Sequence, residues 1–371
     1  MPCLIFFLFY RVKKMGSCDF CKAEPKEKLK SCVCGKASYC SKECQVKDWK
    51  VHKPSCPPFI VRESPGKGRG MFASRKIKEG QIILDEYPLL TVRRPANLPK
   101  FRDNHYPSID EETKEKILKL NDPAENLKTL DLESVKVLIM KNPALLTRLE
   151  AKTDEISKIF RIFCGNNAGI TEDEAGLYNL LSHFNHSCAP NATHSWVKGD
   201  FHRKQVKAIK TIEKDEEILI SYKWGHAEFN LGSREFRRQQ LLEIFGFLCK
   251  CSECSLEGED LEDNERMRAE IVEKDQEIEY LVRHQGSEPI PRKSMKKVMK
   301  LAQERLKLVQ KLDIRTEFLA AMVNFYHFAV RARRMDITCQ NDPDIFKQEA
   351  LKYAKMFGDS SIHCYNIAMG N

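Results

Sequence analysis

The chain has 371 residues, of which 42% are hydrophobic and 31% are charged. This length allows two or three domains with a sizeable core, and the composition is ordinary for a soluble protein. The net charge is +9, and residues 1–100 alone hold 21 Lys and Arg against 9 Asp and Glu, a net of +12. No basic stripe interleaved with aromatic residues accompanies this charge, which argues against a dedicated nucleic-acid site. We interpret it as a solvated lysine surface and leave nucleic acid or an acidic partner open.

The N-terminus reads MPCLIFFLFYRVKK, and its apolar run from Leu4 to Tyr10 is too short to span a bilayer. It lacks the charged n-region and the small-residue cleavage site of a signal peptide. We interpret residues 1–15 as a leader extension and a candidate for disorder, with Met15 as an alternative start. A brief membrane anchor is the less favoured alternative, and we expect no membrane partner.

Residues 16–58 are rich in Cys and His. The spacing is Cys18-x2-Cys21, Cys32-x-Cys34, Cys40-x3-Cys44 and His52-x3-Cys56, which makes eight candidate ligands. Eight ligands can hold two tetrahedral zinc ions, and so short a segment has too little core to fold without them. The alternative is a set of scattered buried thiols. Because protein ligands fill every position, we expect a closed, non-catalytic site.

Strand signals follow in two zones, residues 59–100 and 166–240. SPGKGRGMFASRKIKEG favours a glycine hairpin, because it lacks the strand–turn–helix setting of a dinucleotide site. QIILDEYPLLTV, QVKAIKTI and EEILISY are typical of strands. Between the zones, residues 101–165 are charge-rich and helical in pattern, with three prolines as breaks.

The stretch LLSHFNHSCAPNATH, residues 180–194, puts Cys188 close to His186, which fits a thiol nucleophile or a metal ligand. Residues 241–256 contain Cys249-x-Cys251-x2-Cys254, a zinc half-site with one ligand missing. Cys188 is the one other cysteine in residues 165–248, so we assign it as the fourth ligand and expect three zinc ions in all. The short spacings with a nearby histidine favour zinc over a disulfide framework for the 15 cysteines.

Residues 262–371 show no strand signals. NERMRAEIVEKDQEIEYLV, SMKKVMKLAQERLKLVQKL and RTEFLAAMVNFYHFAVRARRM carry apolar residues at helical spacing. We predict antiparallel helix pairs similar to tetratricopeptide repeats. The whole chain is therefore predicted to be α+β, with a β-rich part between a zinc finger and a C-terminal helical domain.

The motifs GKGRG, NHSCAPN, EEILISY and FGFLCKCSEC occur in the order found in SET domains, and the first cysteine cluster resembles a MYND finger. The chain thus resembles the SET- and MYND-domain protein-lysine methyltransferases, by motif over residues 16–255 and by architecture beyond. The resemblance implies a SET domain in two parts, 59–100 and 166–240, around the helical insert. It also implies that the MYND zinc ligands interleave. One ion would take Cys18, Cys21, Cys40 and Cys44, and the other would take Cys32, Cys34, His52 and Cys56.

The resemblance further implies that S-adenosylmethionine donates a methyl group to a protein lysine. Its cofactor contacts would be Lys67, Gly68, Arg69, Asn185, His186, Tyr222 and Phe247. Asn185 and His186 would bind the cofactor through backbone and side-chain hydrogen bonds, while Phe247 packs on the adenine or lines the lysine channel. Tyr222 would be the catalytic tyrosine that orients the amine.

Two positions depart from the family pattern. The family usually spaces the second MYND pair as C-x2-C, whereas Cys32 and Cys34 are separated by one residue. Phe245 stands in the substrate channel where relatives often carry a tyrosine, so one hydrogen bond is lost and the methylation degree stays open. A MYND-type adaptor with weak or absent methyltransferase activity is the alternative. We expect a monomer in the cytoplasm, the nucleus or both, with histone or other protein substrates and proline-rich peptide partners at the finger.

Overall fold

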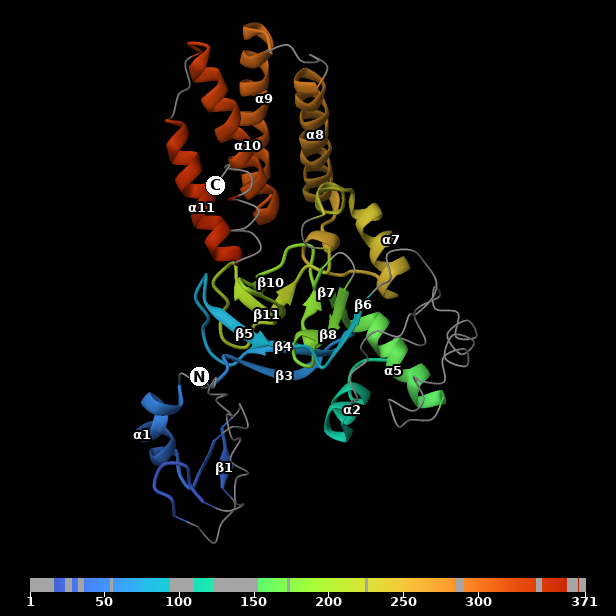
Figure 1. Ribbon diagram of the computed structural model, residues 1–371, viewed down its shortest axis with the longest axis vertical. Helices are drawn as coiled ribbons and strands as arrows, with labels where there is room; N and C mark the ends of the chain where they lie inside the picture. The colour runs from blue at the N-terminus through green and yellow to red at the C-terminus, as the bar shows by residue number, and fades with distance from the viewer. Residues whose placement is uncertain are drawn as a thin grey trace, which may run out of the picture.

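The computed structural model describes residues 17–23, 29–32, 37–53, 56–93, 110–122, 153–171, 174–223, 226–283, 290–337, 342–358 and 366. The predicted leader, residues 1–15, the candidate ligand Cys34 and much of the insert at 101–165 lie outside these residues. The described residues form the predicted α+β arrangement. A small cysteine-rich lobe and a bundle of C-terminal helices lie on opposite sides of a β-rich part (Figure 1).

The cysteine-rich lobe is built from one short hairpin and one helix. Strand β1 (Lys30–Ser31) pairs antiparallel with β2 (Ser38–Tyr39), and α1 (Lys42–His52) follows. The Ser41 side chain accepts a hydrogen bond from the Cys44 backbone N–H over 3.3 Å, which caps the helix start. Helix α1 therefore brings Cys44 in its first turn and His52 in its last turn next to the buried Tyr39.

The predicted glycine hairpin is confirmed. Strand β3 (Phe59–Ser64) pairs antiparallel with β4 (Gly68–Ala73). Gly66 and Gly68 have φ of 72° and 73°, the left-handed region that glycine enters without steric cost. The hairpin therefore needs glycine at these two positions whether or not a ligand approaches.

The other strands form small sheets. One has the order β10 (Ala192–Val197), β11 (Asp200–Ala208) and β5 (Ile82–Glu86); a second has the order β6 (Leu90–Arg93), β8 (Glu174–Leu177) and β7 (Asn167–Gly169). The predicted strand QIILDEYPLLTV is thus divided between two sheets, because Pro88 interrupts it. Of EEILISY, only β12 (Leu219–Ile220) is a strand, and it pairs parallel with β9 (Asn185–His186).

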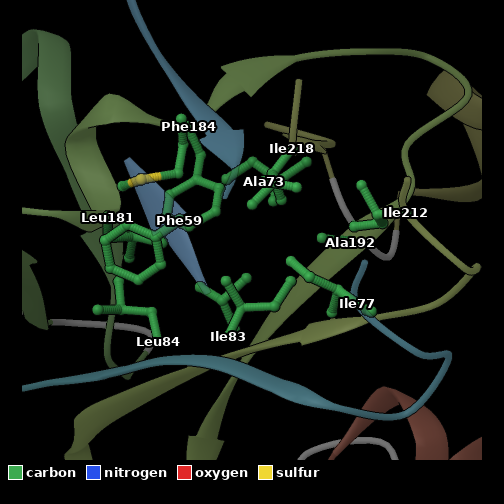
Figure 2. Close-up of a cluster of buried hydrophobic side chains, with 14 of the residues drawn as sticks. Phe59, Ala73, Ile77, Ile83, Leu84, Leu181, Phe184, Ala192, Ile212 and Ile218 are labelled. Carbon is green, nitrogen blue, oxygen red and sulfur yellow. The ribbon is translucent and has the colours of Figure 1, made fainter. Parts of the chain in front are cut away.

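The main core lies between these sheets and contains side chains from segments far apart in the sequence. Figure 2 shows Phe59, Ile83, Phe184, Ala192 and Ile218 converging on it. The Phe184 side chain is 1% exposed and directly precedes β9. This buried ring therefore fixes the start of the segment that carries NHSC.

Helices occupy the remaining described segments. The shorter ones are α2 (Glu111–Leu118), α5 (Thr153–Asn166), η1 (Leu181–His183), α6 (Ala227–Leu231), α7 (Arg234–Phe245) and η2 (Glu253–Ser255). The C-terminal bundle comprises α8 (Gly258–Arg283), α9 (Arg292–Lys311), α10 (Arg315–Arg334) and α11 (Pro343–Phe357). Three of these four were predicted, whereas α11, which contacts β10 and β11, was not singled out. None of the described helices combines the length and the apolar character needed to span a bilayer.

Candidate active site and metal centres

Cys188 lies with the three cysteines that follow α7, as the spacing predicted. Its Sγ is 3.6 Å from the Cys254 Sγ, and its backbone N–H donates to the Cys251 Sγ over 3.4 Å. The ligand atoms of Cys188, Cys249, Cys251 and Cys254 all lie within 4.8 Å of one another. Residues 61 to 66 positions apart in the chain thus meet at one point, which explains why the half-site lacked a local fourth ligand.

The first cysteine cluster divides into the two groups that the resemblance implied. Cys18, Cys21, Cys40 and Cys44 gather in one group, and Cys32, His52 and Cys56 in the other. The Cys40 Sγ is 3.5 Å from both the Cys21 Sγ and the Cys44 Sγ. In the second group the Cys32 Sγ is 3.8 Å from the Cys56 Sγ and 3.3 Å from the His52 Nε2.

These distances fit zinc. A tetrahedral ion with Zn–S bonds of about 2.3 Å holds its sulfur ligands about 3.8 Å apart. The measured separations of 3.5 to 3.8 Å come close to this value, and they are far longer than a disulfide bond of about 2.0 Å. No disulfide joins the described cysteines of these groups, so their sulfur atoms can bind a metal.

The turn of the β3–β4 hairpin is joined to β9 by one carboxylate, Glu217. Its Oε1 accepts hydrogen bonds from the Ser64 hydroxyl and the Asn185 amide, each over 2.8 Å. Its Oε2 forms an ion pair of 2.8 Å with the Lys67 ammonium. The Asn185 amide also donates to the backbone carbonyl of Arg69 over 3.2 Å. Glu217, which was not among the predicted site residues, therefore contacts Ser64, Lys67 and Asn185 directly, and Asn185 connects it to the backbone of Arg69.

Glu217 remains ionised in this setting. Burial opposes its charge, but the hydrogen bonds from Asn185, Lys67 and Ser64 outweigh that effect and hold its pKa below the ordinary value. A Cβ added at Gly70 would lie 2.5 Å from the Glu217 Oε1 and 3.0 Å from the Asn185 Nδ2. The third glycine of GKGRG is thus required for close packing. Glu217 lies five residues before Tyr222, and this position in EEILISY was the available sequence signal.

Asn191, also overlooked, anchors the same region. It is buried, and its Oδ1 accepts from the Leu219 backbone N–H over 2.8 Å. Its Nδ2 donates to the Glu217 carbonyl and to the Glu216 carboxylate, each over 2.9 Å. The side-chain amide thereby makes backbone hydrogen bonds that a neighbouring strand would otherwise make, and it holds β12 beside β9.

His186 connects the cysteine group to Tyr222. Its Nδ1 accepts a hydrogen bond from the Tyr222 backbone N–H over 3.0 Å. Burial lowers the pKa of His186 to about 4, so the ring is neutral and its single proton lies on Nε2. That nitrogen is 3.4 Å from the Cys188 Sγ and donates toward it. Both ring nitrogens therefore have protein partners, which leaves the backbone of His186 for any ligand contact.

Tyr222 lies in an aromatic wall. Its ring centroid is 5.0 Å from that of Phe245, 5.3 Å from that of His186 and 6.2 Å from that of Phe247. Its hydroxyl donates to the Phe184 carbonyl over 3.0 Å. Burial raises the pKa of Tyr222, so the hydroxyl keeps its proton at neutral pH. The group can orient a neighbouring polar atom but does not serve as a base.

The two phenylalanines of this wall are held by the end of α7 and the cysteine loop. Phe245 is the last residue of α7, and Gly246 ends the helix with a left-handed φ of 74°. Phe247 follows and leads directly to Cys249. Phe245, Phe247 and three of the four cysteines therefore lie on one short segment, and the fold brings this segment to Cys188 and Tyr222.

Three further polar side chains near the site donate to protein carbonyls. The Arg69 guanidinium donates to the carbonyl of Lys119, the residue that ends α2. Asn166 and Asn167, which lie at the junction of α5 and β7, donate to carbonyls of α5. These side chains stabilise local structure, so the described site consists of the Glu217 network, His186 and the aromatic wall.

Comparison with known proteins identifies two domains. The SET domain family model matches residues 68–223, and the MYND finger family model matches residues 18–56. The N-lysine methyltransferase SMYD2 of Sus scrofa is 28% identical over 255 residues, covering 66% of this chain and 51% of that protein. The histone-lysine N-methyltransferase SMYD3 of Homo sapiens is 30% identical over 281 residues, covering 72% and 59%.

A fungal relative gives a similar match. The histone-lysine N-methyltransferase set5 of Schizosaccharomyces pombe is 31% identical over 199 residues, covering 54% of this chain and 51% of that protein. The chain thus spans somewhat more than half the length of these relatives. The predicted resemblance is confirmed: this chain belongs to the family of proteins that join a MYND finger to a SET domain.

Proposed function

We propose that the protein is an S-adenosylmethionine-dependent protein-lysine N-methyltransferase that acts on histone or other protein lysines. The observation that carries this proposal is the Tyr222 hydroxyl. It is oriented by the Phe184 carbonyl inside an aromatic wall, next to the Asn185–His186 segment. The SET match and the names of the relatives support the same reaction class.

The chemistry requires a neutral lysine amine, although the pKa of a free lysine is about 10.4. The Tyr222, Phe245 and Phe247 rings form apolar surroundings that disfavour the ammonium ion and lower that pKa. The Tyr222 hydroxyl donates to Phe184, which leaves the phenolic oxygen able to accept a hydrogen bond from the amine. These residues therefore exclude water and fix the direction in which the amine lone pair points.

S-adenosylmethionine, when bound, supplies a methyl group activated by a sulfonium cation. The residues proposed to hold it are Lys67, Gly68, Arg69, Asn185, His186 and Phe247. The donor set fits, because the Glu217 carboxylate and the aromatic faces of Tyr222 and Phe247 suit a cationic ligand. The Arg69 side chain is directed to Lys119 and the His186 ring nitrogens are engaged, so we assign their contacts to the backbone.

We also propose that three zinc ions occupy the three cysteine groups, with Cys34 completing the group of Cys32, His52 and Cys56. Closed thiolate sites of this kind stabilise a fold and leave no open position for catalysis. The MYND finger would bind proline-rich peptides, and we place the monomeric protein in the cytoplasm, the nucleus or both.

Labelled S-adenosylmethionine tests the proposal. We expect transfer of the label to histones or to a protein of a cell lysate by the zinc-loaded wild type. The Tyr222→Phe variant should transfer the label only at the background level. A folded, zinc-loaded wild type that binds the cofactor but labels no protein in either mixture would contradict the proposed activity.

A MYND-type adaptor with little or no methyltransferase activity is the second candidate function. Phe245 favours it, because the channel lacks the tyrosine hydroxyl that relatives often carry. Val46 and Val51 on α1 are 64% and 77% exposed, which suits an interaction surface. Deleting residues 16–58 separates the candidates. If the protein is an enzyme, the deletion variant should keep its basal turnover and lose partners. If the deletion removes all measurable function, the adaptor is favoured.

A further inference from the structure

Arg237, on the second turn of α7, is one of the largest fully buried side chains of the protein, with an exposed fraction of 1%. Its Nη1 donates to the Gly232 carbonyl over 2.5 Å. The Nε and Nη2 atoms are also buried, yet neither has a hydrogen-bond partner among the described residues. A guanidinium carries five N–H donors and is always charged, so this arrangement leaves much of its charge uncompensated.

Helix α7, which carries Arg237, contacts η2 of the cysteine loop, and Leu241, one turn after Arg237, lies in one buried cluster with Cys249 and Cys254. Burial opposes the charge of this guanidinium, whereas thiolate forms of Cys188 and Cys254 would favour it. The described residues contain no salt bridge between Arg237 and a carboxylate, although Glu253 is nearby. Sulfur is therefore the negative partner that the geometry offers to the two unpaired nitrogens.

A second buried arginine makes the need for negative charge stronger. Arg268 on α8 is 2% exposed and forms an ion pair of 2.8 Å with Glu253, which belongs to the cysteine loop. Arg237 disfavours the charge of Arg268, so the two guanidiniums are close enough to repel each other. One carboxylate cannot neutralise both. Four thiolates around a divalent zinc leave two negative charges in excess, which would offset this pair.

We propose that Arg237 compensates the charge of the zinc tetrathiolate formed by Cys188, Cys249, Cys251 and Cys254, and so positions the end of α7. This inference rests on the zinc site proposed above. It gives Arg237 a role at a distance, because α7 ends at Phe245 and continues through Phe247 into the cysteine loop. Arg237 stabilises the zinc site, and the zinc site in turn holds the Phe245 and Phe247 rings against Tyr222. Arg237 is a positioning residue, since it contacts neither substrate nor cofactor.

The experiment compares Arg237→Met, which removes the charge at similar size, with Arg237→Lys, which keeps the charge. Arg161→Met is the control, because Arg161 on α5 is a partly buried arginine that pairs with Asp122 and contacts none of the cysteine groups in the described ion pairs. Zinc release to a chromogenic chelator is followed in the folded proteins. Alkylation with mass spectrometry then assigns each released ion to its cysteine group.

We expect Arg237→Met to release zinc from the Cys188 group about tenfold faster than wild type, as typical for lost outer contacts of a metal site. Arg237→Lys should stay within about twofold of wild type, and Arg161→Met should release it at the wild-type rate. Release from the Cys18 group should be the same in all four proteins. If Arg237→Met is not recovered folded, Arg237→Gln replaces it, because glutamine keeps donors without charge.

One contrary result is that wild type and the neutral variant each bind three zinc ions and release zinc from the Cys188 group at the same rate. That result would overturn the role of Arg237 but not the zinc site. Equal acceleration in the lysine and neutral variants would also overturn it, since charge would then not matter. Wild-type protein whose Cys188 group is alkylated at once and holds no zinc would overturn the proposed zinc site itself.

Discussion

The amide of Asn185 donates a hydrogen bond to the Glu217 carboxylate over 2.8 Å, and this contact joins β9 to the segment that leads into β12. The same carboxylate binds Ser64 and Lys67 of the hairpin turn. Residues that lie 32, 150 and 153 positions from Glu217 in the chain are thereby tied to one charged group. The relationship predicts that a small change at this point disturbs the proposed cofactor side without altering the core.

Gly70→Ala tests this point. The new Cβ would lie 2.5 Å from the Glu217 Oε1 and 3.0 Å from the Asn185 Nδ2, so the carboxylate and the amide must move. We expect S-adenosylmethionine to bind about tenfold more weakly, which corresponds to about 1.4 kcal/mol. Calorimetric titration measures the affinity. Gly169→Ala is the control, because a Cβ there meets no atom within 4 Å. Equal affinities of Gly70→Ala and wild type would show that the Glu217 network does not shape the cofactor site.

Tyr222→Phe removes the hydroxyl that is bonded to the Phe184 carbonyl. We expect methyl transfer to fall by about 100-fold or more, as for other oriented polar groups at a reacting centre. The binding of S-adenosylmethionine should change little, because the aromatic ring remains. Initial rates and cofactor titration measure the two effects separately. Activity that survives the substitution would remove Tyr222 from the reaction.

Phe245→Tyr adds a hydroxyl to the ring that lies 5.0 Å from Tyr222. The new group can hydrogen-bond the amine or a channel water, and it takes space from a methylated amine. One hydrogen bond contributes about 1 kcal/mol, which corresponds to about a fivefold shift in the ratio of mono- to trimethylated product. Mass spectra of the product peptide measure the ratio. Spectra identical to those of wild type would refute a role of Phe245 in the product ratio.

Zinc stoichiometry tests the metal assignment. Elemental analysis should give about three zinc ions for wild type and about two for Cys254→Ser, because three thiolates no longer close the tetrahedral site. The melting temperature should fall with the lost ion, since binding of a structural metal contributes directly to folding. A serine substitution at Cys164, which belongs to none of the three groups, is the control. A wild-type value near two would mean that one proposed site does not bind.

Arg305 and Glu317 form a buried pair in the helical bundle, with exposed fractions of 6% and 5%. Burial raises the pKa of Glu317, while Asn230 and Arg305 oppose that shift. Arg305→Met leaves the carboxylate without its cation and should lower the free energy of unfolding by about 3–5 kcal/mol at neutral pH. Chemical denaturation measures the loss. The double variant Arg305→Met with Glu317→Gln should recover part of it.

This loss should depend on pH. Without Arg305 the pKa of Glu317 rises further, so the folded state binds a proton that the unfolded chain releases. A raised carboxyl pKa makes stability increase as pH falls, and the deficit relative to wild type should shrink as pH falls from neutrality toward the ordinary carboxyl pKa of about 4.3. A deficit that stays constant over this range would mean that Glu317 does not carry the effect.

The zinc groups show which metal ligands could be predicted from short spacings in the sequence. Pairs such as Cys18-x2-Cys21 and Cys249-x-Cys251 predict metal ligands, because a tetrahedral ion needs thiols that close turns can bring together. Cys188 could be assigned to a group more than sixty residues away because it is the one other cysteine in residues 165–248, and the structure brings these four cysteines together. Strands were predicted less well. Only Leu219 and Ile220 of EEILISY pair as a strand, since the Asn191 side chain takes over backbone hydrogen bonds.

Motif spacing, glycine turns and helical periodicity were therefore enough to predict the MYND and SET domains, the α+β class and the grouping of most candidate metal ligands. These features depend on residues that are close in the chain or on fixed chemical types. The partners of Glu217, the engaged ring of His186 and the burial of Arg237 were decided by tertiary contacts. Charge and hydrogen-bond compensation in a folded protein depend on which distant segments meet. The pattern of residues along the chain does not show which distant segments will be in contact.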